Sequence, residues 1–276
     1  MAAFSFLDPR IAAGAIAFSS VSVVANTSVR APTNQSARPS PGFRHRLTPM
    51  GKTVEFTSNG KSATGWMELP ESGRGPGVVV IQEWWGLDPH IKDIVGRFAR
   101  EGFVALAPDL YHGEETAEPD EGEKLMMAMD LERVANDMKG AVDYLVSHTA
   151  VTGPGVGAVG FCMGGGLVLW LACLSDKVTA AVPFYGGPWP EASPNFKSSV
   201  AAFQGHYAEH DDWAGPELVQ QLESQLQELG LSAEFFVYPG TRHAFFNDDR
   251  PEDHDPEASQ IAWARTIEFL NSRLGR

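Results

Sequence analysis

Short apolar runs alternate with longer amphipathic segments over most of this chain. Six runs have the length of buried strands, at residues 76–82, 103–107, 157–161, 179–185, 201–204 and 233–238. Five segments predict helices, at residues 90–101, 124–147, 164–174, 216–229 and 257–273. Strands that alternate with helices in this way predict a single α/β domain, with a mostly parallel central sheet and helices on both faces. We see no internal repeat and no apolar run long enough to cross a membrane.

The first 49 residues differ from this pattern in composition. They contain five arginines, no lysine and one acidic residue, Asp8, among many Ala, Ser and Thr residues. This composition is typical of an organelle transit peptide, which would place the protein in a chloroplast or a mitochondrion. The alternatives are a disordered extension or a misassigned start in a cytoplasmic protein, and a secretory signal. We therefore expect the folded domain to span residues 50–276.

The charge of the chain limits its partners. The formal net charge is −14 at pH 7, and it becomes −18 for residues 50–276, because the first 49 residues carry five arginines and one aspartate. An acidic surface of this kind argues against nucleic acid and anionic membranes as partners. We expect a monomer that binds a small molecule. The acidic stretches 114–123 and 248–257 have no recognisable metal-loop spacing, so we predict neither a metal nor a cofactor.

Residues 160–165, Gly-Phe-Cys-Met-Gly-Gly, lie between an apolar strand and a helix. A strand, a Gly-X-nucleophile-X-Gly turn and a helix form the nucleophile elbow of α/β-hydrolases, here with Cys162 in place of the more usual serine. Glycines at the flanks let strand and helix approach closely while the nucleophile adopts a strained backbone conformation. Two other interpretations stay open, because glycine-rich turns also bind phosphates and a buried cysteine is often inert.

An acid follows the elbow in the chain order that this architecture uses. Asp211 lies in the loop after the strand at 201–204, and its neighbour Asp212 is the alternative. Either aspartate alone would be read as a solvated loop residue. The acid is needed because it holds the imidazole tautomer and stabilises the cation that forms during the reaction.

A histidine comes next, also at the end of a strand. His243 follows the strand at 233–238 and a Pro-Gly turn, and only His112 and His206 are also near strand ends. A free cysteine has a pKa of about 8.5, so a neighbouring imidazole must take the proton before the sulfur attacks. The second cysteine, Cys173, is about three helical turns away, too far to form a disulfide with Cys162. A free reactive thiol fits a reducing compartment.

The strand at 76–82 ends at Glu83, Trp84 and Trp85. The backbone N–H of Met163, after the nucleophile, supplies one donor of an oxyanion hole, and that of Trp84 is our candidate for the second. Glu83 is unusual, because a carboxylate at the end of a central strand is partly desolvated and its pKa is shifted. The alternative is a structural carboxylate that pairs with a local basic group.

These motifs together resemble the dienelactone hydrolase (carboxymethylenebutenolidase) family, from about Met50 to the C-terminus. The resemblance implies an α/β-hydrolase without a metal and a triad of Cys162, Asp211 and His243. It also implies that Glu83 takes part in converting the resting thiol to thiolate. The motifs are Gln-Glu-Trp-Trp-Gly at 82–86, Pro-Asp-Leu-Tyr at 108–111, the elbow at 160–165, His-Asp-Asp at 210–212 and His-Ala-Phe at 243–245.

The substrate pocket departs from the family pattern. We expect Trp85, Tyr111, His112 and Phe245 to line it. The dienelactone-cleaving prototype holds the substrate's carboxylate with arginines after the Asp-Leu-Tyr motif and after the catalytic histidine. Here the two stretches read His-Gly-Glu-Glu and Ala-Phe-Phe-Asn. The acids at these places predict that a neutral ester reacts faster than its anionic analogue.

Three functions are compatible with these residues. The first is hydrolysis of a small ester or lactone by a cysteine nucleophile through an acyl-enzyme. The others are a thiol redox sensor and a catalytically silent hydrolase fold that binds a small molecule. The ordered acid and histidine favour catalysis, because a sensor needs no triad.

Overall fold

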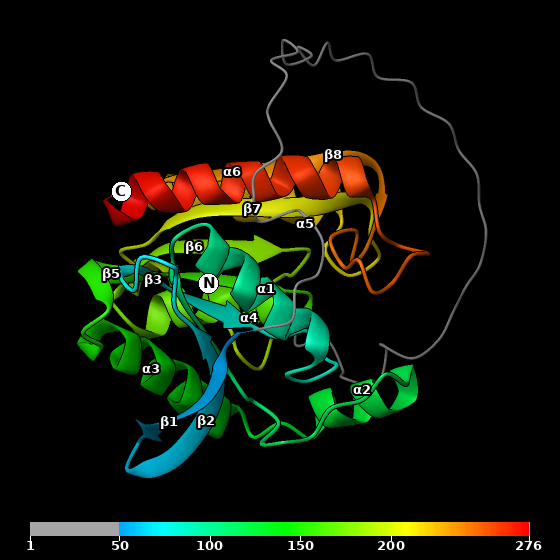
Figure 1. Ribbon diagram of the computed structural model, residues 1–276. Helices are drawn as coiled ribbons and strands as arrows, with labels where there is room; N and C mark the ends of the chain where they lie inside the picture. Colours follow the sequence, from blue (N-terminus) through cyan, green and yellow to red (C-terminus); the bar gives the residue numbers. More distant parts are fainter. Residues whose placement is uncertain (1–49, 276) are drawn as a thin grey trace, which may run out of the picture. The chain divides into compact units, whose positions relative to one another are not determined.

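Eight strands form one sheet in the order β1-β2-β4-β3-β5-β6-β7-β8 (Figure 1). This computed structural model describes residues 50–275. The predictions made for residues 1–49 therefore lie outside the described residues. The strands are β1 (Lys52–Ser58), β2 (Lys61–Glu68), β3 (Gly75–Ile81), β4 (Val104–Pro108), β5 (Val151–Phe161), β6 (Val178–Phe184), β7 (Ala202–His210) and β8 (Ala233–Arg242).

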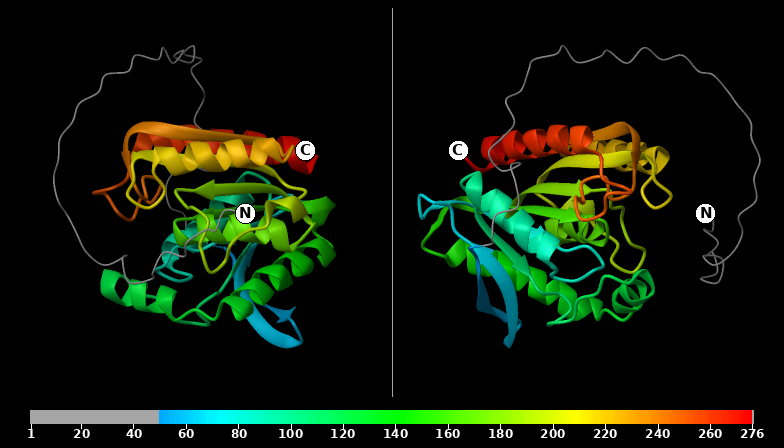
Figure 2. Two further views of the ribbon diagram at one scale, coloured as in Figure 1. Left: turned by 180° about the vertical axis from the view of Figure 1, so that it is seen from behind. Right: turned by 45° about the vertical axis from the view of Figure 1, so that its right-hand side comes forward.

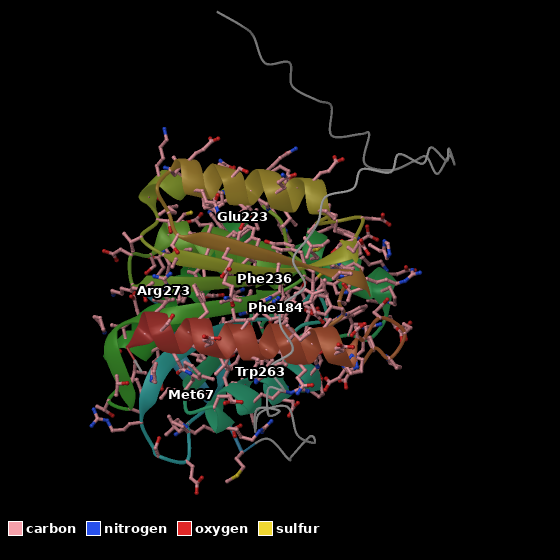
Figure 3. The ribbon with its side chains drawn as sticks, turned by 90° about the horizontal axis from the view of Figure 1, so that it is seen from above. Met67, Phe184, Glu223, Phe236, Trp263 and Arg273 are labelled. Carbon is pink, nitrogen blue, oxygen red and sulfur yellow. The ribbon has the colours of Figure 1, made fainter. Side chains whose placement is uncertain are left out.

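The sheet is parallel from β4 to β8 and antiparallel only where β1 and β2 join it. It carries helices on both faces, as predicted. Figure 3 shows the helices α5 and α6 on opposite sides of the strands, with Trp263 on α6. The helices are α1 (Pro89–Arg100), α2 (Pro119–Met127), α3 (Leu131–Ser147), α4 (Met163–Leu174), α5 (Pro216–Glu228) and α6 (Pro256–Leu274), with a short 3-10 turn at Phe196–Ser198.

Strand β3 shows how the two apolar layers are built. Successive side chains of a strand point to opposite faces, so an apolar run without polar interruption predicts burial on both. Val78 and Val80 pack into the layer beneath α1 and α6, whereas Val79 and Ile81 pack into the layer beneath α3 and α4. The central strand is thus fixed from both sides, and its carboxyl end has a defined position for the site.

The hairpin β1–β2 was not anticipated. It joins the sheet antiparallel through β2 and lies at the edge opposite β8 (Figure 2). Its turn is Asn59-Gly60, and both residues have positive φ, 46° and 76°. An Asn-Gly pair between two alternating segments is a strong hairpin signal, so this element was recognisable from the sequence.

The helix predicted at 124–147 is wrong as a single element. The structure divides it into α2 and α3, and α2 begins at Pro119. The division lies at Asp130, whose side chain accepts a hydrogen bond from the N–H of Arg133 (3.1 Å) and caps α3. An aspartate at this position starts a helix rather than continuing one. Within residues 50–275, no helix combines the length and the apolar character that crossing a membrane requires.

Candidate active site

Cys162 lies at the sharp junction between β5 and α4. Its backbone has φ 54° and ψ −117°, a conformation that is strained for a residue with a side chain. The flanking glycines allow the close approach of strand and helix. A Cβ on Gly160 would lie 2.2 Å from the Gly164 carbonyl oxygen, and one on Gly164 would lie 2.5 Å from that of Ile81. The local geometry is that of a nucleophile elbow.

Asp211 and His243 meet beside this junction. Asp211 follows β7 and His243 follows β8, and His243 Nδ1 lies 2.8 Å from Asp211 Oδ2. The other carboxylate oxygen accepts hydrogen bonds from the N–H groups of Trp213 (2.8 Å) and Ala214 (3.1 Å). Asp212 is exposed. The structure therefore brings Asp211, rather than its neighbour, to the histidine.

The electrostatics of the pair favour a charged imidazole. Burial lowers the pKa of His243, but hydrogen bonds with Asp211 and with Cys162 outweigh it and raise the pKa to about 10. Burial likewise raises the pKa of Asp211, and the hydrogen bond and charge of His243 bring it below its ordinary value. An ionised aspartate behind a cationic imidazole stabilises the proton on that ring.

Glu83 lies at the end of β3, and its side chain is held by two groups. Its carboxylate accepts hydrogen bonds from the Tyr185 hydroxyl (3.3 Å) and from the Asn247 side-chain amide (2.6 Å). Burial raises the pKa of Glu83, against the charge of buried His90 and the Asn247 hydrogen bond, which lower it. Glu83 and Cys162 line the same cavity. The local partners of Glu83 are thus a phenol and an amide.

The sequence reasoning missed the roles of Tyr185 and Asn247. Tyr185 directly follows β6, has φ 37° and is fully buried, with its ring 5.1 Å from the His243 ring between centroids. Its position at the carboxyl end of a strand was the available signal. Asn247 was noted only for standing where the family prototype has an arginine, yet its amide holds the carboxylate of Glu83.

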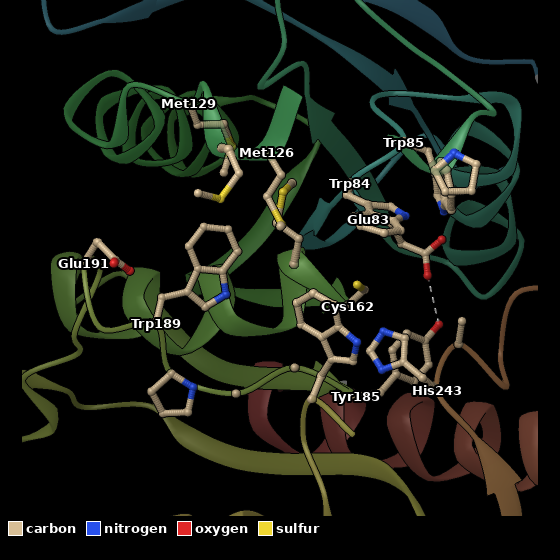
Figure 4. Close-up of a pocket in the computed structure, with 18 of the residues that line it drawn as sticks. Glu83, Trp84, Trp85, Met126, Met129, Cys162, Tyr185, Trp189, Glu191 and His243 are labelled. Atoms are coloured by element: carbon tan, nitrogen blue, oxygen red, sulfur yellow. Dashed lines mark hydrogen bonds between the residues drawn. The ribbon is translucent and has the colours of Figure 1, made fainter. Parts of the chain in front are cut away.

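Cys162 lines a cavity of about 620 Å³. Figure 4 shows Cys162 between a polar end, with Glu83 and His243, and an apolar end, with Trp189 and Met129. The residues proposed for the oxyanion hole, Trp84 and Met163, also line this cavity. Met163 is the first residue of α4, where backbone N–H groups have no acceptor inside the helix.

The predicted pocket residues divide into two groups. Trp85 lines the cavity, whereas Tyr111, His112 and Phe245 do not, contrary to expectation. The Tyr111 hydroxyl donates to the Met163 sulfur (3.3 Å), and His112 Nε2 lies 3.3 Å from an Asp137 carboxylate oxygen. Phe245 is fully buried in the core. Proximity to a strand end did not distinguish side chains that point into the cavity from those that point into the core.

The charges at the cavity also differ from those expected. Glu114 and Glu115, which suggested repulsion of an anion, are not among the residues that line it. Arg250 does line it, and its guanidinium lies 3.6 Å from the centroid of the Trp85 ring. Stacking of this kind holds a guanidinium over an aromatic face. The expectation that acids in the loop after β4 repel an anionic substrate therefore does not apply to this cavity.

One group of possible metal ligands occurs in the described part of the chain, at His90, Asp248 and Asp249. His90 Nδ1 lies 3.2 Å from Asp248, which also accepts a hydrogen bond from Arg97. Burial raises the pKa of Asp248, but His90 and Arg97 together hold it well below its usual range. Because a guanidinium already neutralises Asp248, this group forms an ion-pair network between α1 and the loop after β8.

The strand order, the strained elbow and the acid–histidine pair define the chain as an α/β-hydrolase. Comparison with known proteins agrees, since the dienelactone hydrolase family model matches residues 64–274. Protein usf of Aquifex pyrophilus is 38% identical over 234 residues, which cover 82% of this chain and 100% of that protein. A candidate 2-oxo-3-(5-oxofuran-2-ylidene)propanoate lactonase of Bradyrhizobium sp. is 31% identical, over 80% of this chain and 94% of that one.

Solved structures give the same result. A candidate dienelactone hydrolase from Klebsiella pneumoniae superposes with a TM-score of 0.70 at 26% identity, covering 80% of this chain and 98% of that one. A dienelactone hydrolase-like promiscuous phosphotriesterase from metagenomic libraries has a TM-score of 0.74 at 23% identity, covering 82% and 99%, and shows the shared fold. The chain belongs to the dienelactone hydrolase family and is a carboxylic ester hydrolase.

Proposed function

We propose that the protein hydrolyses a small ester or lactone by a cysteine nucleophile, through an acyl-enzyme. The observation that carries the proposal is the position of Cys162 on a strained elbow next to the Asp211–His243 pair. Relatives named as a carboxymethylenebutenolidase and as a lactonase support the substrate class. The ordered pair disfavours the alternatives, a redox sensor or a silent binding protein, because neither needs an oriented imidazole.

The reaction proceeds in two halves. His243 holds the proton from the thiol of Cys162, and the sulfur attacks the carbonyl carbon to give a tetrahedral oxyanion. The N–H groups of Trp84 and Met163 are our candidates to bind that oxyanion. The carbon–oxygen bond then breaks, and the leaving alcohol or enol takes the proton from His243. Water attacks the thioester in the second half, gives its proton to His243, and releases the acid and the thiol.

Glu83 has a proposed part in the first half. A permanent thiolate is open to oxidation, so a carboxylate that takes the thiol proton only when substrate is bound, and passes it on to His243, protects the sulfur. The carboxylate lines the cavity with Cys162, and burial raises its pKa, which favours a carboxyl that exchanges a proton.

Selective alkylation tests the nucleophile. Iodoacetamide should label Cys162 well before Cys173, because burial raises the pKa of Cys173 to about 12 and keeps it a neutral thiol. Mass spectrometry should show labelling at Cys162 in step with loss of esterase activity, and Cys162→Ala should be inactive. Cys173→Ala is the matched control and should keep full activity. Labelling of Cys162 in a protein without any esterase activity would favour the sensor or the binding protein instead.

A further inference from the structure

The cavity is larger than the chemistry at Cys162 requires. A volume of about 620 Å³ is in the range of pockets that enclose drug-sized ligands, far above the needs of a small lactone ring. On the side of Cys162 away from Glu83, Figure 4 shows the uncharged side chains of Trp189, Met126 and Met129, with exposed Glu191 beyond Trp189. Met127, Leu131 and Leu218 also line the cavity.

Some of the apolar side chains that line the cavity are also exposed to solvent. Nine large apolar side chains are exposed in the described part of the chain, and three of them line this cavity. They are Met127, Trp213 and Leu218, exposed by 77%, 65% and 37%. Clustered apolar exposure marks a surface that a ligand or a partner covers. Because these three side chains line the cavity that also contains Cys162, a substrate bound there would contact them.

The helix that carries part of this wall is lightly held. In α2 only Gly122 is buried, and it packs against the Trp85 ring, where a Cβ would come within 3.4 Å. The methionines that face the cavity lie at the end of this helix and just beyond it. Methionine is unbranched and flexible, so it adapts to apolar ligands of different shape.

The charged groups of the cavity restrict where a polar part of the ligand lies. Among the described lining residues, the cationic side chains are Arg250 and His243, and both lie at the Glu83 end. Glu191 lies beyond Trp189, at the far end of the apolar half. An apolar group can therefore extend from the reacting carbonyl along the tryptophan and methionine side chains without desolvating a charge.

We propose that the substrate carries an extended apolar group, an alkyl chain or an aryl ring, on one side of its ester bond. This group lies along Trp189, Met126 and Met129, while the reacting carbonyl lies at Cys162. The proposal rests on the hydrolase function proposed above and adds the class of substrate. Each methylene that leaves water contributes about fourfold to binding when fully buried, and about twofold at a wall that is half open.

Two series of esters test the proposal. In the first, the acyl part of a p-nitrophenyl ester lengthens from butyrate to octanoate; in the second, the alcohol part of a butyrate ester lengthens from ethyl to hexyl. We expect kcat/KM to rise by ~10-fold or more across four added methylenes in at least one series. Values that are flat or falling in both series would overturn the proposal.

A pair of variants locates the effect. Trp189→Ala should lower the ratio of the rates on the long and short esters by about fivefold, because the chain loses its wall. Val200→Ser is the control, since Val200 is an exposed apolar residue, 59% accessible, that is not part of the cavity lining. In Val200→Ser, the ratio of the rates on the long and short esters should equal that of the wild type. An unchanged ratio in a folded Trp189→Ala protein would contradict the position given to the chain.

Binding to Cys162→Ala separates this proposal from the hydrolase function. Trp84, Trp189 and Trp213 line the cavity, so tryptophan fluorescence reports occupation without turnover. The Kd of the octanoate ester should be at least ~10-fold below that of the butyrate ester. If this difference is found while wild-type turnover does not depend on Cys162, the function is wrong and the apolar site stands. If turnover depends on Cys162 but Kd does not depend on chain length, the apolar site is wrong.

Discussion

At the scale of single residues, the site depends on how each carboxylate is held. One carboxylate oxygen of Asp211 accepts hydrogen bonds from two backbone N–H groups, and the other contacts His243. The backbone therefore holds the Asp211 carboxylate independently of His243. Glu83 instead accepts hydrogen bonds from the side chains of Tyr185 and Asn247. The bonds of Asp211 hold the imidazole of His243 in place. The bonds of Glu83 leave a buried carboxyl group that can gain or lose a proton.

Asp211→Asn should lower kcat by roughly 10⁴-fold, as loss of the correct imidazole tautomer does in a serine protease. The amide has nearly the same shape, but it cannot stabilise the imidazolium that forms when His243 holds the thiol proton. Asp212→Asn is the matched control, and it should change kcat by less than about twofold, because Asp212 is exposed. Steady-state kinetics on one ester measure kcat for both variants. The assignment within the pair is wrong if the two effects are reversed.

Glu83→Gln should slow acylation by ~10²-fold or more, the usual contribution of a positioned acid or base. The fold should be little affected, because a glutamine can accept from Asn247 and donate to the Tyr185 hydroxyl after that hydroxyl rotates. Burst kinetics with a p-nitrophenyl ester measure acylation separately from deacylation. Glu252→Gln, on an exposed residue, controls for the loss of one negative charge. Normal acylation in Glu83→Gln would make Glu83 a structural carboxylate.

At the scale of elements, the site exists because strand β5 and helix α4 meet with almost no space between them. Gly160 faces the Gly164 backbone, and Gly165 faces the Phe184 carbonyl oxygen at 2.6 Å from an added Cβ. These contacts are with backbone atoms, which cannot move aside as the end of a flexible side chain does. The junction therefore couples the position of Cys162 to the packing of three elements, β5, α4 and β6.

Gly160→Ala should be strongly destabilising, by about 3 kcal/mol or more, since it forces apart backbone that is in contact. The matched control is Gly96→Ala in the middle of α1, where the nearest atoms are the ends of two flexible side chains, Arg100 at 3.2 Å and Glu68 at 3.3 Å. There an alanine is expected to stabilise the helix by roughly 0.5–1 kcal/mol. Denaturant unfolding of both variants gives the two values. Equal changes in the free energy of unfolding in the two variants would contradict the steric explanation of the elbow.

At the scale of the whole molecule, local patterns predicted most of the fold and the approach of Asp211 to His243. Six parallel strands, four of the helices, and the meeting of Asp211 and His243 near Cys162 followed from apolar periodicity and strand ends. The pattern failed where a capping residue interrupts an amphipathic stretch. One amphipathic stretch at 124–147 was divided by the cap at Asp130, and this placed the methionines at the cavity.

The partners of Glu83 could not be predicted in this way. Tyr185 and Asn247 are separated from Glu83 by 102 and 164 residues, and they meet it only because the ends of β3, β6 and β8 converge. The sequence contains no periodicity that connects these distant positions. Tyr185 was recognisable as a residue at a strand end, but the sequence does not show that it and Asn247 donate to the same carboxylate.

The composition of residues 1–49 predicts where the protein is located in the cell. Residues 1–49 combine five arginines with a single acidic residue, whereas residues 50–276 carry a charge of −18. A basic, serine-rich leader on an acidic protein is expected to direct it to a chloroplast or a mitochondrion. Fused to a fluorescent protein, residues 1–49 should be sufficient for import, and residues 50–276 alone should stay in the cytoplasm. Replacing the five arginines with glutamine is the control and should abolish import, because import signals of this class depend on positive charge. A fusion that is secreted, or that stays in the cytoplasm, would contradict the prediction.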